Sequence, residues 1–311
     1  MVSGRSAPDI VAAYESCLRD VRAHYENFPV ASLLLPESRR PHIAAVYAFA
    51  RAADDFADEG RLPENERLGL IDGWLGRLRR AASSDEPGPP PRPGEPPHTP
   101  AIFLAVGATI HSCELPVHLF EDLLSAFRQD VTVARSATWE ELFDYCRRSA
   151  QPVGRLVLRI AGHRDARLDG WSDAICTALQ LTNFWQDLRV DFDRGRLYLP
   201  DGERRSHGAR EEDLASGRTT PEWRHALSAC ATRTRALFEA GSPLCDAVGG
   251  RLRHELRATW LGGVRLLDRL EHAGFDLHAR PTIGIVDAPW FAWRMMTWAA
   301  RRHPAPHRTP S

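Results

Sequence analysis

The sequence predicts a single all-α domain whose helices surround a deep central cavity. Apolar residues recur at three- and four-residue spacing over most of the 311 residues, and alternating strands joined by Asn-Gly or Asp-Gly turns are not found. Hydrophobic residues make up 43% and charged residues 26%, so the chain can bury a sizeable core. Two acidic motifs of helical spacing lie about half a chain apart, and we expect them to face each other across the cavity mouth.

The periodic segments give the predicted helices in chain order. They cover residues 8–27, 40–59, 64–82, 100–112, 116–130, 138–161, 170–191, 221–240 and 243–273. Residues 86–100 are rich in proline, which predicts an extended, mobile connector inside the domain. Residues 195–216 are polar and rich in glycine and arginine, and they form a candidate flap. We assign residues 1–302 to one domain and expect a disordered tail over 303–311.

Charge and cysteine content exclude several classes of protein. The formal net charge is -1 and no basic stripe is present, so we expect no nucleic-acid partner. All 40 basic residues are arginines, so any phosphate clamp must use their bidentate guanidinium groups. The six cysteines are scattered, which indicates core residues of a reducing compartment.

Targeting features are not evident in the sequence. The first residues lack an apolar signal core, and no stretch approaches the roughly 20 apolar residues that span a bilayer. We therefore expect a cytoplasmic protein, and peripheral attachment to the inner membrane face stays open.

The first acidic motif lies in the segment 47–59. Asp54 and Asp58 are one helical turn apart, so they share a face, and Arg51 precedes Asp54 by a turn. Asp55 adds a third carboxylate. Arg51 could orient an aspartate or hold phosphate oxygens, and the simpler alternative is an intrahelical ion pair.

The second acidic motif lies in the segment 180–191. Gln180, Asn183, Asp187 and Asp191 follow a 3-4-4 spacing, which places them on one stripe of a helix. Carboxylates four residues apart repel each other by a few tenths of a kcal/mol, and a hard cation removes that penalty. Two such stripes predict a site for a diphosphate bridged by Mg²⁺ ions. The alternative is a pair of solvated acidic faces, which apolar neighbours on both motifs disfavour.

These motifs, with the segment Gly195-Arg-Leu-Tyr198-Leu-Pro200, resemble the squalene/phytoene synthase family. The resemblance extends from about residue 24 to residue 280. Two further segments, 25–36 and 145–154, most resemble hydroxysqualene synthases of bacterial hopanoid biosynthesis. This implies an isoprenoid synthase-type helical bundle that ionises presqualene diphosphate and lets water quench the cation.

The resemblance also implies roles for individual residues. Two or three Mg²⁺ ions would be held by Asp54, Asp55, Asp58, Asn183, Asp187 and Asp191. Diphosphate would be contacted by Arg51, Arg196, Tyr198 and Arg280, although a solvated loop position is an alternative for Arg280. Tyr145 and Gln180 would place dipoles near the cation. Phe28, Tyr47, Phe184 and Trp260 would line a tunnel for the isoprenoid tails, with ordinary core packing as the alternative for each.

Two more residues are assigned to the substrate site with alternatives. His24 either contacts diphosphate or satisfies the core. Gly154 follows a proline inside a helical pattern, which predicts a kink beside the cavity.

Departures from the family pattern bear on the reaction. Glu26 stands near a position where relatives carry lysine, Gln186 stands where arginine is common, and Gln151 replaces an expected asparagine. The two missing cations favour a substrate with one diphosphate. No G-x-G-x-x-G loop is present, so we expect no nicotinamide cofactor.

Two rival functions are kept. One is a head-to-head synthase that condenses two prenyl diphosphates. The other is a non-catalytic assembly protein of the same fold. Neighbouring enzymes of the squalene pathway are possible partners.

Overall fold

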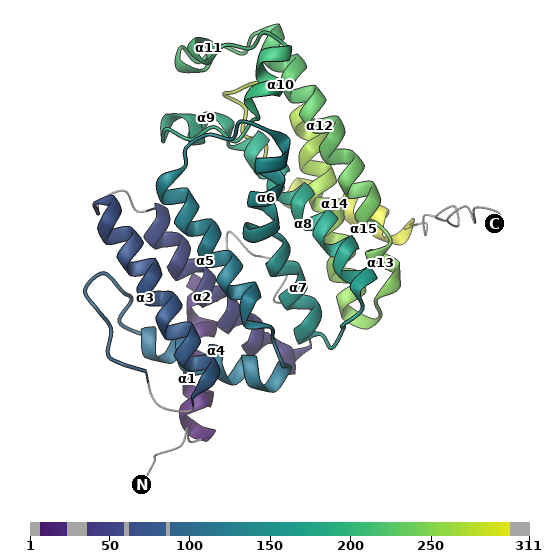
Figure 1. The fold of residues 1–311 in the computed structure, drawn as a ribbon. Helices are drawn as coiled ribbons and strands as arrows, with labels where there is room; N and C mark the ends of the chain where they lie inside the picture. Colours follow the sequence, from purple (N-terminus) through teal and green to yellow (C-terminus); the bar gives the residue numbers. More distant parts are fainter. Residues whose placement is uncertain (1–6, 24–35, 59–61, 85–87, 299–311) are drawn as a thin grey trace, which may run out of the picture.

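The computed structural model describes residues 7–23, 36–58, 62–84 and 88–298 (Figure 1). The main helices are α1 (Ala7–Ala23), α2 (Arg40–Asp58), α3 (Glu64–Ser83), α4 (Thr99–Cys113), α5 (Val117–Thr132), α6 (Trp139–Ser149), α7 (Gln151–Ile160), α8 (Ala166–Gln186), α12 (Pro221–Gly241), α14 (Gly250–His272) and α15 (Ala288–Met296). Short helices α9 (Leu188–Asp193), α10 (Asp201–Ser206), α11 (Glu211–Ala215) and α13 (Leu244–Ala247) connect them, with 3₁₀ turns η2 (Glu37–Arg39) and η3 (Ile285–Asp287). The predicted all-α class is confirmed, since the described residues hold a single isolated β-bridge.

The helices form two groups that meet along α6 and α7. Figure 1 shows α1 to α5 on one side of the molecule and α8, α12 and α14 on the other. Within the groups, α1 packs on α2 and α4, and α8 packs on α12, while α7 joins α8 to the rest. The short helices α9 to α11 lie together at one end, above α5 and α6 in Figure 1.

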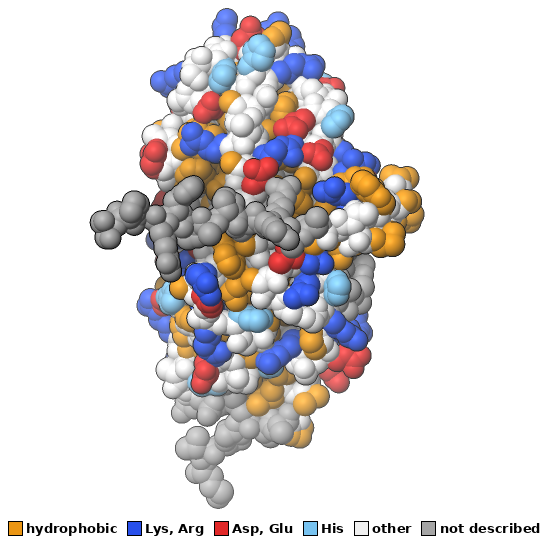
Figure 2. Space-filling model, turned by 90° about the vertical axis from the view of Figure 1, so that its right-hand side faces the viewer, with side chains coloured by type: hydrophobic (Ala, Val, Ile, Leu, Met, Phe, Trp, Pro, Cys, Tyr) orange, Lys and Arg blue, Asp and Glu red, His pale blue; other side chains and the backbone are white. Residues whose placement is uncertain are grey.

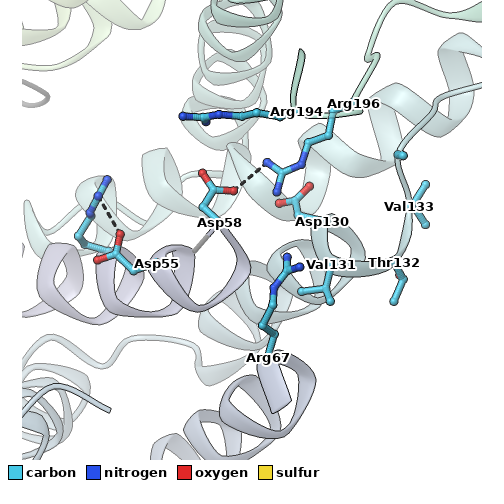
Figure 3. A pocket seen from close by; sticks show the side chains of 11 residues that line it. Asp55, Asp58, Arg67, Asp130, Val131, Thr132, Val133, Arg194 and Arg196 are labelled. Carbon is cyan, nitrogen blue, oxygen red and sulfur yellow. Dashed lines mark hydrogen bonds and ion pairs between the residues drawn. The ribbon is translucent and has the colours of Figure 1, made fainter. Parts of the chain in front are cut away.

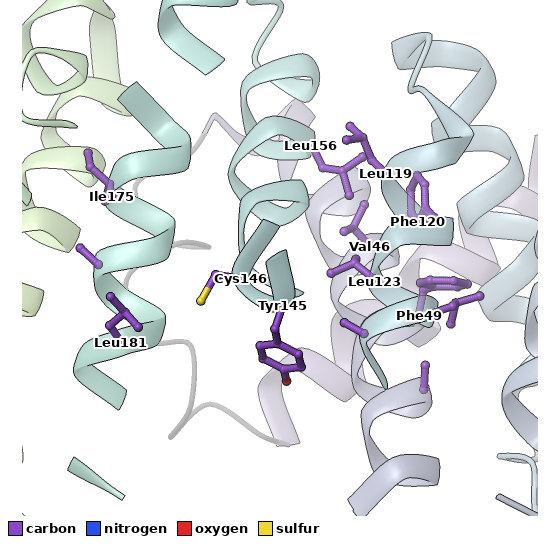
Figure 4. Packing of buried hydrophobic residues seen from close by; sticks show 14 of the residues in the cluster. Val46, Phe49, Leu119, Phe120, Leu123, Tyr145, Cys146, Leu156, Ile175 and Leu181 are labelled. Atoms are coloured by element: carbon purple, nitrogen blue, oxygen red, sulfur yellow. The ribbon is translucent and has the colours of Figure 1, made fainter. Parts of the chain in front are cut away.

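The core of the first group is aromatic. Phe49 on α2 is fully buried, with its ring 5.3 Å from that of Phe120 and 6.0 Å from that of Phe103. The indole nitrogen of Trp74 donates to the Phe49 carbonyl at 3.2 Å. Figure 4 shows Phe49, Phe120 and Leu123 gathered between α2 and α5. This packing holds one face of α2 inward and leaves its acidic residues on another.

The predicted and observed helices differ in places. The helix predicted over 138–161 breaks at Ala150, because Pro152 lacks an amide donor and cannot continue the preceding turn. The kink therefore precedes Gly154, which lies inside α7. The candidate flap over 195–216 contains α10 and α11. Helix α15 was not predicted at all.

The proline-rich connector was expected to be mobile, but its described part is fixed by a buried arginine. Arg77 pairs with Glu95 at 2.7 Å, and both side chains are almost fully buried. Its guanidinium also donates to the carbonyls of Pro89 and Pro90, each at 2.7 Å. Because prolines leave free carbonyls and no amide donors, one arginine can satisfy several of them. The predicted tail over 303–311 lies outside the described residues.

Within the described ranges, no helix combines the length and the apolarity needed to cross a membrane.

Candidate active site

The first acidic motif lies at the C-terminal end of α2. Ala52, Ala53 and Phe56 are buried, so the helix turns Asp54, Asp55 and Asp58 toward a less buried face. Arg51 pairs with Asp55 at 2.7 Å and lies 3.8 Å from Asp54. The intrahelical ion pair considered as the alternative for Arg51 is therefore present. The Arg51 guanidinium lies closer to Asp55 than to Asp54.

The second motif crosses a helix joint. Helix α8 ends at Gln186, Asp187 caps it, and α9 begins at Leu188. The hydrogen bonds nevertheless continue, since the Asp187 amide donates to the Asn183 carbonyl and the Asp191 amide donates to the Asp187 carbonyl, both at 2.8 Å. The predicted stripe is thus kept through the joint.

The segment after α9 connects the two motifs. Gly195 adopts φ +84°, a left-handed conformation that permits the tight turn. The following stretch is extended, with Leu197 and Leu199 buried and Arg196 and Tyr198 on the alternate side. As a result Arg196 Nη1 donates to Asp58 Oδ1 at 2.7 Å. This contact joins the family-like Gly-Arg-Leu-Tyr segment to the first acidic motif.

Arg280 binds the second motif from a different part of the chain. Its guanidinium makes a bidentate contact with Asp187, with Nε–Oδ1 at 2.6 Å and Nη2–Oδ2 at 3.0 Å. Gln186 Nε2 donates to the Pro281 carbonyl at 2.7 Å, which holds this loop against the end of α8. The glutamine that departs from the family pattern therefore positions the neighbouring loop, and Arg280 supplies a guanidinium at the motif.

Asp130, at the end of α5, is a site residue that the sequence analysis missed. Its Oδ2 accepts a hydrogen bond from the Tyr145 hydroxyl at 2.9 Å, and its Oδ1 accepts one from Tyr198 at 3.4 Å. The rings of Phe184 and Tyr198 are stacked at 3.9 Å. Burial raises the pKa of Asp130 from 3.8 to about 7, with Asp54 among the carboxylates that add to the shift. Asp130 has no motif partner at helical spacing, so nothing in the sequence distinguished it.

The pKa shifts show an electrostatic interaction between the two motifs. Burial, followed by repulsion from Asp58, raises the pKa of Asp54 to about 6. Burial, followed by repulsion from Asp187, raises the pKa of Asp191 to about 6, and Asp58 contributes to this shift across the site. Burial of its hydroxyl, followed by the charge of Asp130, raises the pKa of Tyr198.

A pocket of about 590 Å³ lies at this end of the bundle. Residues 131–134 line part of it. The rest of its described lining consists of charged side chains of both signs: Arg51, Asp55, Asp58, Arg67, Asp130, Arg194 and Arg196. Figure 3 shows Asp58 and Arg196 pointing toward one another across it, with Asp130 beside them. The carboxylates of the second motif are not in this lining, which contains Arg194 and Arg196 from the segment that follows the motif.

The donor set fits Mg²⁺ only together with a ligand. Among the residues that the structure describes, no three His, Cys, Asp or Glu side chains converge closely enough to hold a metal alone. Mg²⁺ in proteins often takes only one or two carboxylates and completes its octahedron with phosphate oxygens and water. The pairs Asp54–Asp58 and Asp187–Asp191, in which Asp58 adds to the raised pKa of Asp54 and Asp187 to that of Asp191, match that requirement.

Other predicted site residues lie in varied surroundings. Trp260, on α14, is buried, and its indole donates to the carbonyl of Phe238 on α12 at 2.7 Å. Gly154 packs against α8, and a Cβ there would lie 2.3 Å from Ser172 Oγ. Tyr47 and Gln180 are half-buried on α2 and α8. The predicted residues His24 and Phe28 lie outside the described residues.

Comparison with known proteins gives one family. The family model described as squalene/phytoene synthase matches residues 21–287. A hydroxysqualene synthase of Zymomonas mobilis is 36% identical over 225 residues, covering 72% of this chain and 71% of the relative. A phytoene synthase of Thermus thermophilus is 31% identical over 265 residues, covering 85% of each chain.

Solved structures agree with this assignment. The crystal structure of squalene synthase HpnC from Alicyclobacillus acidocaldarius superposes with a TM-score of 0.78 at 38% identity, covering 87% of this chain and 97% of that one. A dehydrosqualene synthase superposes with a TM-score of 0.81 at 18% identity, which supports the fold alone. The chain belongs to the squalene/phytoene synthase family.

Proposed function

We propose that the protein converts presqualene diphosphate and water to hydroxysqualene and diphosphate in a Mg²⁺-dependent reaction. The observation that carries the proposal is that Arg196 links both acidic motifs, since its guanidinium donates to Asp58 at 2.7 Å and its backbone amide donates to the Asp191 carbonyl at 2.8 Å. The similarity to hydroxysqualene synthases of Zymomonas mobilis and Rhodopseudomonas palustris, each 36% identical, supports this reaction over others of the family.

The acidic residues would hold two or three metal ions. Asp54 and Asp58 would act from α2, and Asn183, Asp187 and Asp191 from the α8–α9 joint. When bound, Mg²⁺ would neutralise the charge that develops on the leaving diphosphate. Asp55 would act from α2 as well, and it pairs with Arg51 at 2.7 Å, much as Asp58 and Asp187 pair with their own arginines.

The arginines would exchange partners when substrate binds. Arg196 and Arg280 each pair with a predicted metal ligand, Asp58 and Asp187 respectively. A carboxylate that takes a metal offers less to its guanidinium, and diphosphate oxygens are equally good bidentate acceptors. We infer that these ion pairs keep the site neutral before substrate arrives and then turn toward the diphosphate.

The proposed reaction balances without a redox partner. The carbon–oxygen bond to diphosphate breaks and its electron pair leaves with the diphosphate, so the organic fragment becomes a carbocation. After rearrangement of the cyclopropylcarbinyl cation, a water oxygen forms the new carbon–oxygen bond and releases a proton. No hydride is consumed, so the proposal needs no nicotinamide.

Aromatic groups beside the charged pocket suit the cationic stage. Tyr145, Phe184 and Tyr198 form one cluster, with ring centroids 3.9 to 6.0 Å apart. Their faces are negative and attract a passing cation. Asp130 accepts hydrogen bonds from both tyrosine hydroxyls and thereby fixes the ring orientation.

Substitution of the acidic residues tests the metal assignment. Asp54→Ala and Asp187→Ala should abolish turnover and leave the helical circular-dichroism spectrum unchanged. Asp72→Ala, on the exposed face of α3, is the matched control and should retain activity. Full activity in either pocket variant would refute the assignment.

Condensation of two prenyl diphosphates is the second candidate, favoured by the 85% coverage of the Thermus phytoene synthase. It predicts that the purified protein alone consumes farnesyl or geranylgeranyl diphosphate. A non-catalytic assembly role predicts that neither Mg²⁺ nor diphosphate binds. We also propose a cytoplasmic location and, as partners, neighbouring enzymes of the squalene pathway.

A further inference from the structure

A group of large apolar side chains is exposed around η3 and α15. Relative exposures are 93% for Ile285, 82% for Val286, 80% for Met296, 55% for Trp293 and 41% for Ile283. We call these five residues the C-terminal apolar face. Figure 2 views the side of the molecule on which α15 lies and shows hydrophobic side chains gathered on a projection at the right edge. Such clustering marks an interaction surface, whereas singly scattered exposed apolar residues do not.

The C-terminal apolar face is held on a rigid support. Asp287 is buried and accepts hydrogen bonds from Arg265 at 3.2 Å and Arg269 at 2.7 Å, both on α14. Its other oxygen accepts the Gly284 amide at 2.9 Å. A buried carboxylate with two guanidinium partners fixes the turn that presents Ile285 and Val286 outward. Their exposure is thus a property of the folded structure.

Helix α15 is anchored by its opposite face. Trp298, just beyond the helix, stacks edge-on against Trp260 at 5.5 Å, and its indole donates to Asp246 at 3.0 Å. Trp290 and Phe291 pack against the core. The helix therefore has one face packed on the protein and one face of Trp293 and Met296 directed to the outside.

The charge around the face favours an anionic surface. Between Asp287 and the end of the described chain at residue 298, the one charged side chain is the cation Arg294, and the sequence after residue 298 adds three arginines and no acidic residue. Arg294 lies 5.8 Å from the rings of both Trp290 and Trp293. Tryptophan with neighbouring arginine is the combination found where helices lie in the headgroup region of anionic membranes. A two-fold contact between copies would instead bring the Arg294 side chains of both copies to one interface.

We propose that the C-terminal apolar face docks the protein on the surface of an anionic lipid bilayer, with Ile285, Val286, Trp293 and Met296 entering the headgroup boundary. The charge complementarity and the apolar side chains act together, since short apolar segments alone bind bilayers weakly.

Docking would place the bilayer beside the acidic site. Arg280, which pairs with Asp187, precedes Ile283 by three residues, so their Cα atoms are at most about 11 Å apart. The loop between them is held to α8 through Gln186 and Pro281. This step alone rests on the proposed function: a hydrophobic substrate and product would then exchange between the membrane and the site over a short path.

Vesicle co-sedimentation tests the proposal with the full chain and without substrate or metal. Wild type should pellet with vesicles of phosphatidylglycerol and phosphatidylcholine, and much less with phosphatidylcholine alone. The combined variant Ile285→Ser, Val286→Ser, Trp293→Ser should lose binding by about tenfold or more. Arg294→Gln should weaken binding only to the anionic vesicles. Val11→Ser, which removes an apolar side chain 57% exposed on α1, is the matched control and should bind as wild type.

Two further measurements keep the outcomes distinct. Thermal unfolding of the triple variant should match wild type, because the replaced side chains are exposed. Sedimentation velocity without vesicles should show the same mass for both proteins. Equal vesicle binding by wild type and triple variant, or a dimer that only the triple variant abolishes, would overturn the proposal. Neither result depends on the reaction catalysed.

Discussion

Asp130→Asn is the perturbation whose effect can be worked out most fully. Burial raises the pKa of the Asp130 carboxyl from 3.8 to about 7, despite the hydrogen bond from Tyr145 and the charge of Arg196. Between pH 4 and 7 the folded protein therefore holds a proton that the unfolded chain has released. By linkage, the free energy of unfolding falls as pH rises through this window, and the loss is complete above about pH 7.

The size of the effect follows from the pKa difference. A shift of about three pKa units corresponds to about 4 kcal/mol, at 1.36 kcal/mol per unit, and is an upper limit because the pocket admits water. Asparagine cannot ionise and can still accept the Tyr145 hydrogen bond. Asp130→Asn should match wild type near pH 4.5 and be more stable at pH 8, with a melting temperature higher by about 5 °C.

The assay is thermal unfolding in EDTA from pH 4.5 to 8.5, followed by circular dichroism. Asp144→Asn is the control of opposite sign, because hydrogen bonds from Arg147 and Arg148 lower the pKa of that exposed carboxyl. It should be slightly less stable than wild type at pH 8. A difference between Asp130→Asn and wild type that does not change with pH would refute the reasoning.

Three other predictions concern the site and its support. Arg196→Gln removes the guanidinium that reaches Asp58 at 2.7 Å, and it should lower kcat/KM by about 10- to 100-fold while the fold persists, measured as diphosphate release. Gly154→Val would press a side chain against Ser172 and should destabilise the protein by about 1–3 kcal/mol in urea unfolding, whereas Gly76→Ala, with open space around it, should not. Chelation of Mg²⁺ by EDTA should abolish turnover, and re-addition should restore it; activity that persists in EDTA would contradict the metal assignment.

The sequence predicted the helices that bury a broad apolar stripe. The expected range 40–59 differs from α2 by one residue, because its alanines and phenylalanines repeat every three or four positions. Helix α15 was missed since it has nine residues and its apolar positions lie on both sides, one packed and one exposed. Nothing in its spacing indicates which aromatic residues face the protein.

The parts of the candidate site that could be predicted are the pairs of aspartates that recur at four-residue spacing along one helix. Asp54 with Asp58 and Asp187 with Asp191 could be found by spacing, and Arg196 by family resemblance. Asp130 could not, because its partners come from α6 and from the turn after α9 and meet it only in the folded chain. The helix break was predicted at Gly154 and lies at Ala150. Gly154 instead allows α7 to pack closely on α8, a contact that also forms only in the folded chain.

The most direct test of the proposed function is incubation of the purified protein with Mg²⁺ and presqualene diphosphate, and separately with farnesyl diphosphate, followed by mass analysis of the products. We predict hydroxysqualene from the first incubation and no product from the second. A cyclopropyl diphosphate or a longer condensed product from farnesyl diphosphate would contradict the proposed reaction.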